Sequence, residues 1–132
     1  MQPLMAMATG NPNAHRVLVV DDNLDTAETL RFLLRDMGHE VEFAINGRAA
    51  LEVSRRFRPD LVFLDLGLPD FDGCELARLM KAEAGAERLR IIALTGRAGD
   101  EDRQRARDAG CDEFIVKPLD PRFLESLLGL RR

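Results

Sequence analysis

Five polar residues stand at the ends of four short apolar runs, and the three carboxylates among them suit the binding of a cation. They are Asp21, Asp22, Asp65, Thr95 and Lys117. If the apolar runs are parallel strands of one sheet, the three carboxylates among them meet at one edge. At about 4 Å and an effective dielectric constant near 20, each carboxylate pair repels by roughly 4 kcal/mol. A cation must offset that cost, and Mg²⁺ is the hard divalent ion that a few carboxylates and waters hold best.

Each of these residues, taken alone, has an ordinary structural explanation. An Asp-Asp pair after a strand most often caps a helix or lies in a solvated turn. A single threonine or lysine at a strand end is uninformative. The hypothesis of a site therefore depends on all five residues lying together, and on the elements that would bring them there.

Short apolar runs alternate along the chain with amphipathic segments of helical period. The predicted strands cover residues 17–20, 41–45, 61–64, 91–94 and 114–116. The helical patterns cover residues 24–37, 46–53, 76–80, 100–109 and 121–128. Several strands are apolar throughout, which is typical of strands buried on both faces. The alternation predicts an α/β fold, a doubly wound five-stranded parallel sheet with five helices, whose ligands bind beyond the carboxyl ends of the strands.

Local signals predict where these elements begin and which residues point inward. Asp25 and Glu28 have the spacing of a capping box, and Asn46 and Asp120 are placed to cap later helices. Pro121 suits the first position of the last helix. The periodicity also places four large apolar residues on inward faces: Leu24, Ile45, Leu79 and Phe123.

Composition excludes several classes of protein. Lys and Arg total 19 against 23 Asp and Glu, which gives a net charge of −4. The chain therefore lacks the excess of basic residues that is typical of nucleic-acid-binding proteins. No apolar run approaches the roughly 18 residues of a membrane span, and no signal peptide is evident. We therefore expect a cytoplasmic protein with no membrane partner, in which Cys74 and Cys111 are reduced packing residues. Residues 1–15 are expected to form a flexible N-terminal tail and residues 16–130 the folded domain.

Four segments of this chain, in order, resemble the receiver domain of two-component response regulators. They are Asp21-Asp22, the stretch Asp65-Leu-Gly-Leu-Pro-Asp-Phe-Asp-Gly, Ala-Leu-Thr95-Gly, and Phe114-Ile-Val-Lys117-Pro118. The resemblance covers residues 16–130. It implies a flavodoxin-like sheet with strand order 2-1-3-4-5, and a signalling domain that promotes only its own phosphorylation and dephosphorylation rather than an enzyme.

The resemblance implies a role for each residue of the site. Asp65 would be the nucleophile that takes a phosphoryl group from a phosphohistidine of a sensor histidine kinase or histidine phosphotransferase. Asp22 and Asp65 would bind Mg²⁺ directly, Asp21 mainly through water, and the Gly67 carbonyl would be a further ligand. The Lys117 ammonium and the Thr95 hydroxyl would bind phosphoryl oxygens, and Pro118 suggests a cis peptide bond after Lys117.

The resemblance also implies a switch. Phosphorylation would draw Thr95 inward and let Phe114 rotate, which would remodel the face formed by the helix at 100–109, the strand at 114–116 and the last helix for a downstream partner. Ordinary core packing remains the alternative for Phe114. The helix at 100–109 is either a solvated charged face or a docking or dimer surface, so a monomer or a weak homodimer is expected.

Other interpretations stay open at this point. A haloacid-dehalogenase-type phosphatase shares the residue types but needs Asp-x-Asp after the first strand, and a flavodoxin-type electron carrier needs a phosphate loop where this chain is acidic. The chain is either a complete single-domain regulator or a receiver taken from a hybrid sensor kinase. His15 and His39 lie away from the acidic residues, and Gly67 and Arg97 leave the lifetime of an aspartyl phosphate open.

Overall fold

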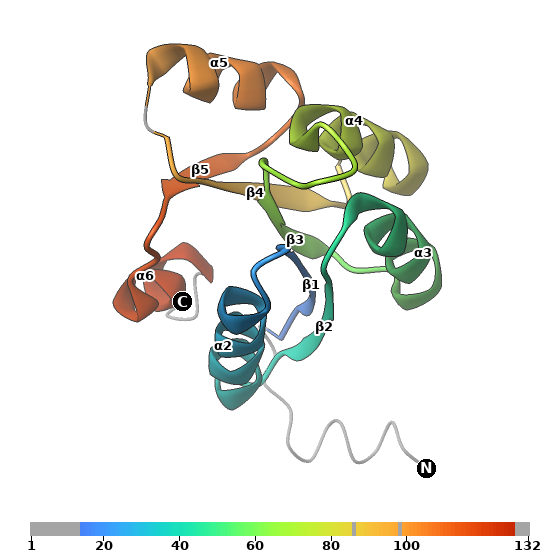
Figure 1. The fold of residues 1–132 in the computed structure, drawn as a ribbon. Coiled ribbons are helices and arrows are strands. Elements are labelled where there is room, and N and C mark those ends of the chain that lie inside the picture. Colours follow the sequence, from blue (N-terminus) through green and yellow to red (C-terminus); the bar gives the residue numbers. More distant parts are fainter. Residues whose placement is uncertain (1–13, 86, 98, 129–132) are drawn as a thin grey trace.

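The computed structural model describes residues 14–85, 87–97 and 99–128. Residues 1–13, which make up most of the expected tail, and residues 129–132 lie outside the described residues. Figure 1 shows a central sheet with helices on both faces. None of the described helices has the length and apolar character that a membrane crossing requires.

Strands and helices alternate along the described residues, five of each. The strands are β1 (Arg16–Val20), β2 (Glu40–Ala44), β3 (Leu61–Asp65), β4 (Arg90–Thr95) and β5 (Glu113–Val116). The helices are α2 (Leu24–Asp36), α3 (Gly47–Phe57), α4 (Gly73–Ala84), α5 (Asp100–Asp108) and α6 (Pro121–Leu128). All neighbouring strands pair in parallel, in the order β2-β1-β3-β4-β5. The predicted fold and strand order are confirmed.

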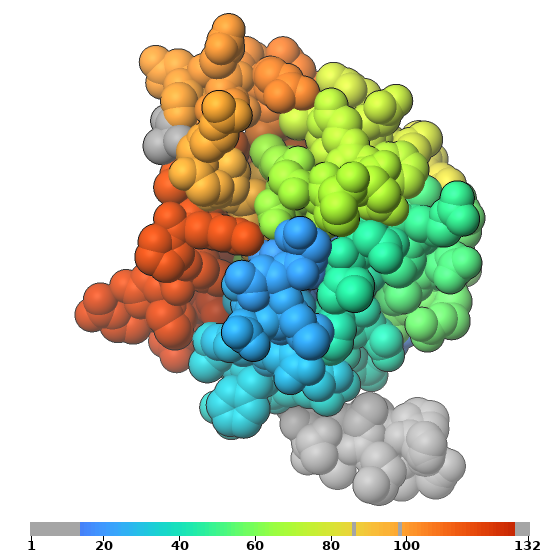
Figure 2. All heavy atoms as spheres, viewed as in Figure 1, coloured from blue at the N-terminus to red at the C-terminus, as the bar shows by residue number. Residues whose placement is uncertain are grey.

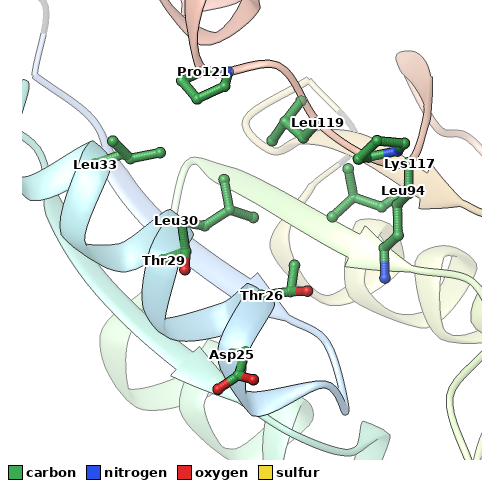
Figure 3. Close-up of a pocket in the computed structure, with 10 residues that line it drawn as sticks. Asp25, Thr26, Thr29, Leu30, Leu33, Leu94, Lys117, Leu119 and Pro121 are labelled. Carbon is green, nitrogen blue, oxygen red and sulfur yellow. The ribbon is translucent and has the colours of Figure 1, made fainter.

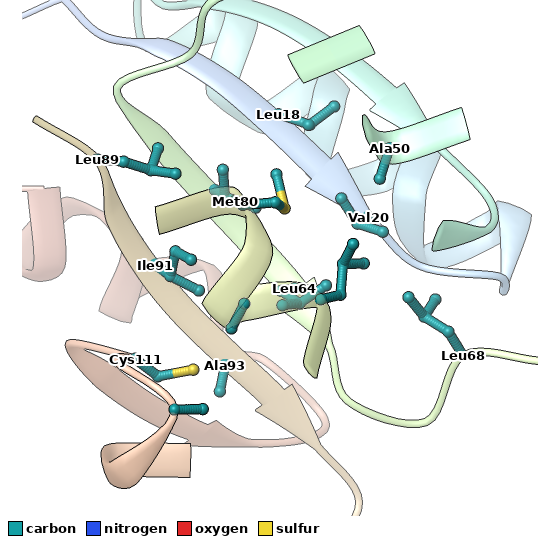
Figure 4. Close-up of a cluster of buried hydrophobic side chains, with 14 of the residues drawn as sticks. Leu18, Val20, Ala50, Leu64, Leu68, Met80, Leu89, Ile91, Ala93 and Cys111 are labelled. Carbon is teal, nitrogen blue, oxygen red and sulfur yellow. The ribbon is translucent and has the colours of Figure 1, made fainter. Parts of the chain in front are cut away.

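Two separate hydrophobic cores lie on the two faces of the sheet, because successive strand residues point to opposite faces. Val17, Val19 and Phe63 pack with α2 and α6 on one face. Leu18 and Val62 belong to the other core, which α3, α4 and α5 cover (Figure 4). All five residues of β3 are buried, as expected for a strand covered on both sides.

The two cysteines belong to the core on the α3–α4–α5 face. Cys74 and Cys111 are free and buried. Burial raises the pKa of the Cys111 thiol to about 12, so the reactive thiolate is scarce at neutral pH. Both residues therefore act as small apolar groups, as the sequence suggested.

The capping-box prediction for the first helix is wrong. The N-cap of α2 is Asn23, whose side-chain oxygen accepts a hydrogen bond from the Thr26 N–H at 3.2 Å. Asp25 lies inside the first turn, where its negative charge interacts favourably with the helix dipole. Only the N-cap residue therefore separates the Asp21-Asp22 pair from the first residue of the helix.

The four large apolar residues predicted to face inward are exposed: Leu24, Ile45, Leu79 and Phe123. Ile45 follows Ala44, the last residue of β2 paired with β1, so it has left the sheet. In α4 the buried stripe runs through Leu76, Ala77 and Met80, and Leu79 lies at its solvent-facing margin. The buried stripe of α6 is limited to Leu124 and Leu128, which turns Phe123 outward.

A polar cluster lies at the opposite edge of the sheet from the strand ends discussed above. The backbone N–H of His15 donates to Nδ1 of His39 at 2.9 Å, and His15 Nδ1 lies 3.3 Å from Asp60 Oδ1. His39 is buried, and its Nε2 atom has no hydrogen-bond partner among the described residues. Burial, and then the neighbouring His15, lower the pKa of His39, while Asp60 acts in the opposite direction.

This lowered pKa makes folding sensitive to acid. As the pH falls below about 6.5, the unfolded chain protonates at His39 before the folded chain does, so the free energy of unfolding should decrease. The variant His39→Gln should lose this part of the pH dependence, and His15→Gln, which removes one cause of the lowered pKa, should reduce it. Urea unfolding at about pH 7.5 and about pH 5.5 measures the change in the free energy of unfolding. An unchanged pH dependence in His39→Gln contradicts the assignment.

Candidate phosphoacceptor and metal site

The register of the sheet brings the acidic residues together. Val20 of β1 pairs with Leu64 of β3, so Asp21 and Asp65, each one residue further along, lie at adjacent positions at the carboxyl edge. In Figure 2 the segment after β1 (blue), the loop after β3 (light green) and the segment after β5 (orange-red) meet at the centre of this face. The predicted convergence of strand ends is present in the structure.

Asp21, Asp22 and Asp65 form an acidic cluster. One carboxylate oxygen from each lies within 4.8 Å of the others. Asp21 is fully buried and Asp65 is nearly so, whereas Asp22 is exposed. At these separations the three negative charges repel one another strongly, and the partial burial reduces the screening by water.

Lys117 places an ammonium group inside this cluster. Its Nζ atom lies 2.8 Å from Asp21 Oδ2 and 3.4 Å from Asp65 Oδ2. The Lys117–Pro118 peptide bond is cis, as predicted. Burial alone would lower the pKa of Lys117, but the hydrogen bond and charge of Asp21, followed by those of Asp65, raise it overall. Lys117 is therefore positively charged at neutral pH.

Asp21 directs one oxygen, Oδ2, toward the cationic part of the site. Burial raises the pKa of Asp21, against the lowering effects of Lys117 and of the Asn23 N–H, which donates to Oδ1 at 2.9 Å. Oδ2 is buried and has no aligned hydrogen bond among the described residues, although Lys117 Nζ lies close enough for an ion pair. Buried oxygens of this kind, grouped with two further carboxylates, fit a hard divalent cation.

The β3–α4 loop borders the acidic cluster through Gly67. The backbone N–H of this exposed residue donates to Asp65 Oδ1 at 2.9 Å, which fixes the direction of the carboxylate. A Cβ atom at position 67 would lie 3.6 Å from the same oxygen. Gly67 therefore leaves the approach to Asp65 open.

Thr95 and Phe114 lie on the same face of the sheet, beside α5. Thr95 is buried, and its Oγ1 accepts a hydrogen bond from the Arg97 N–H at 3.1 Å. Phe114 pairs in register with Ala93, two residues before Thr95. Its ring is half-buried against the α3–α4–α5 core, and the guanidinium carbon of Arg103 lies 4.8 Å from the ring centroid. Thr95 therefore belongs to the site edge, and Phe114 lies apart from the acidic cluster.

An apolar groove of about 470 Å³ lies beside the acidic cluster, between α2 and the segment before α6 (Figure 3). Leu30, Leu33 and Leu119 contribute to its walls, and Lys117 borders it. Its mostly apolar lining offers no set of metal ligands. The chemistry of this edge therefore belongs to the acidic cluster, not to the groove.

Contacts that tie the β3–α4 loop to neighbouring helices were not evident from the sequence. Asp70 accepts hydrogen bonds from two N–H groups at the start of α3. Asp72 caps α4 through Cys74 N–H and pairs with Arg105 of α5 at 3.3 Å. These partners are far apart in the chain. The one sequence signal for the first contact is the lack of an acidic residue in the first turn of α3, which leaves that helix end without a negative charge of its own.

The family model described as "Response regulator receiver domain" matches residues 17–128. The chain belongs to this family. It is 35% identical over 112 residues to the polar-differentiation response regulator DivK of Brucella anthropi, covering 84% of this chain and 91% of DivK. It is 42% identical over 105 residues to an uncharacterized 14.6 kDa protein of Leptolyngbya boryana, with 80% of each covered.

Solved structures agree with this assignment. The chemotaxis protein CheY4 of Vibrio cholerae matches with a TM-score of 0.82 and 30% identity, over 87% of this chain and 96% of CheY4. Phosphorylation on an aspartate and binding of Mg²⁺ are general to receiver domains. The family assignment excludes the phosphatase and flavodoxin interpretations and leaves the roles of individual residues of this receiver domain to be proposed.

Lys117 should compete with a divalent cation for the acidic cluster. Removing the ammonium in Lys117→Met leaves Asp21 without its charge partner and should destabilise the metal-free protein by about 1–3 kcal/mol, less than for a fully buried pair. Mg²⁺ should then raise the melting temperature more in this variant than in the wild type. Lys81→Met, which removes an ion pair with Asp112 away from the site, is the matched control. A smaller or equal Mg²⁺ response in Lys117→Met contradicts the competition.

Proposed function

We propose that Asp65 is the phosphoacceptor of this receiver domain and that residues 16–130 form the functional unit, preceded by the tail at 1–15. The observation that carries the proposal is the position of Asp65 between two other carboxylates and Lys117 Nζ, which is 3.4 Å from its Oδ2 atom. The Gly67 N–H donates a hydrogen bond to the other oxygen, Oδ1. Oδ2 is therefore the oxygen directed toward the cationic part of the site.

The proposed reaction is the transfer of a phosphoryl group from a phosphohistidine. An oxygen of the Asp65 carboxylate attacks phosphorus, a P–O bond forms, the P–N bond to the histidine breaks, and the imidazole leaves with the bonding electron pair and takes up a proton. The donor is a sensor histidine kinase or a histidine phosphotransferase. The reaction changes the chain itself, so the domain acts as a signalling component and not as an enzyme with turnover.

Asp21, Asp22, Asp65 and the carbonyl of Gly67 are the proposed ligands of Mg²⁺. The buried, incompletely satisfied oxygen of Asp21 and the convergence of three carboxylates support this donor set. When bound, Mg²⁺ would neutralise the carboxylates and stabilise the charge on the transferring phosphoryl oxygens.

Lys117 and Thr95 are the proposed partners of the phosphoryl oxygens. Lys117 already carries its charge beside Asp65, so it can pair with an oxygen of the new group without moving far. The Thr95 hydroxyl can donate to another oxygen, and its bond from Arg97 N–H links that donation to the β4–α5 segment. Lys117 would thus offset part of the charge of the product, and Thr95 would report its presence.

The proposed output is a change of the α5–β5–α6 face. Thr95 and Phe114 share one face of the sheet, so inward movement of Thr95 changes the space beside Phe114. Arg103 stacks over the Phe114 ring, and movement of the ring therefore alters the exposed surface of α5. A downstream protein, or weakly a second copy of the chain, would read this surface in the cytoplasm.

The first test replaces the nucleophile. Asp65→Asn keeps the shape of the side chain but cannot take a phosphoryl group, so phosphorylation by acetyl phosphate with Mg²⁺, or by a histidine kinase, should disappear while the fold remains. Intact-protein mass spectrometry measures the phosphorylated fraction, and Asp36→Asn at the exposed end of α2 is the control. Full phosphorylation of Asp65→Asn would falsify the site assignment.

The second test follows the switch. The phosphoryl mimic beryllofluoride, bound with Mg²⁺, should shift amide resonances around Asp65 and also across the α5–β5–α6 face. Thr95→Ala should keep the first set and lose much of the second, because only the hydroxyl that links phosphate to the core is gone. The coupling involved is a few kcal/mol, so a partial population shift is expected.

Thr29→Ala on α2 is the matched control for this test and should retain both sets of shifts. If the mimic binds fully in the wild type and the α5–β5–α6 face does not respond, the switch part of the proposal is wrong. Asp65 would then act as a phosphate relay or sink, and Phe114 would only fill the core.

A further inference from the structure

The β3–α4 loop, residues 66–72, is held against the start of α3 by a carboxylate far away in the sequence. Asp70 Oδ1 accepts a hydrogen bond from the Gly47 N–H at 2.7 Å, across 23 residues of chain. Asp70 Oδ2 accepts a second from the Arg48 N–H at 3.1 Å. Both oxygens of this carboxylate are therefore directed at the first turn of α3.

Asp70 completes the hydrogen bonding at the amino end of α3. The first N–H groups of a helix have no partner within the helix. The N-cap residue Asn46 serves one of them, accepting from the Ala49 N–H at 2.8 Å. Two more of these groups, on Gly47 and Arg48, are bound by Asp70. Since α3 has no acidic residue in its own first turn, Asp70 also supplies the negative charge that the helix dipole favours.

Close packing accompanies these hydrogen bonds. A Cβ atom on Gly47 would lie 2.4 Å from Cδ2 and 2.8 Å from Cβ of Phe71, so a larger residue there would displace the loop. At the other end of the loop, a Cβ atom on Gly73 would lie 2.4 Å from the Cα atom of Leu66. The loop therefore has little room to shift toward α3 or onto itself.

The anchored loop carries the groups next to the phosphoacceptor. The Gly67 N–H donates to Asp65 Oδ1, which leaves Oδ2 toward Lys117. Asp70 follows only three positions after Gly67. Release of the carboxylate from α3 would therefore free the segment that orients Asp65 and presents the Gly67 carbonyl.

We propose that Asp70 is a positioning residue for the phosphoacceptor site, which holds the β3–α4 loop on α3 and thereby keeps Gly67 in place for Asp65 and for Mg²⁺. The inference rests on the proposed function of the acidic cluster. Leu68 anchors the same loop by its burial in the α3–α4–α5 core (Figure 4). Loss of Asp70 therefore weakens the site and does not abolish it.

The test compares Asp70→Ala and Asp70→Asn with Asn46→Ala. The Asp70 variants should bind Mg²⁺ about tenfold more weakly, the usual effect of removing a residue that supports metal ligands. They should also show faster amide exchange at Gly67 and Leu68 in metal-free protein. Asn46→Ala removes a cap from the same helix without touching the loop, so it should lower the melting temperature and leave Mg²⁺ affinity within about twofold of the wild type.

Calorimetry and NMR are the suitable measurements, because the chain contains no Trp or Tyr to report binding by fluorescence. Asp70 variants that lose stability but keep wild-type Mg²⁺ affinity and exchange rates overturn the inference, since Asp70 is then only a helix cap. An equal loss of affinity in Asn46→Ala also overturns it. If Asp22→Ala does not change Mg²⁺ binding, the proposed metal site itself is wrong. The amide exchange rates at Gly67 still decide the role of Asp70 in that case.

Discussion

Repulsion among the carboxylates at the strand ends is the constraint on which the arrangement of this edge depends. Asp21 is buried and Asp65 nearly so, and neither can be hydrated freely. Lys117 offsets part of this repulsion with two ion pairs, and its pKa is raised as a result. The charge balance is nevertheless incomplete, because three carboxylates face one ammonium group. A site that is short of positive charge favours the arrival of a further cation.

The backbone of the sheet fixes the positions of the charged groups at this edge. The parallel register places Asp21 beside Asp65, and the β4–β5 pairing places Lys117 directly after Val116, the partner of Thr95. The helices cover both faces, and the polar groups of the site come from the last residues of β3 and β4 and from the segments that follow the strands. Because the sheet is rigid and its register is fixed by two buried faces, small movements are left to the loops.

The sequence was sufficient to predict the fold and the convergence of the site residues, because buried strands have a strong apolar signal and their ends must meet. The cis Lys117–Pro118 bond was also predictable, since such bonds occur almost only before proline. The exposure of Leu79 was not, because it lies beside Leu76 at the margin of the buried stripe, and helical spacing alone does not show where that stripe ends. The contact of Asp70 with α3 was missed because it joins segments that become neighbours only after folding.

The separation of the two cores by the sheet has an evolutionary consequence. Neighbouring residues such as Val62 and Phe63 contribute to opposite cores and share few partners. Substitutions under α2 and α6 should therefore combine almost additively with substitutions under α3, α4 and α5. The two sides of the molecule can then evolve independently. Substitutions near α2 can adapt that surface to a new partner while the surface near α5 keeps its existing one.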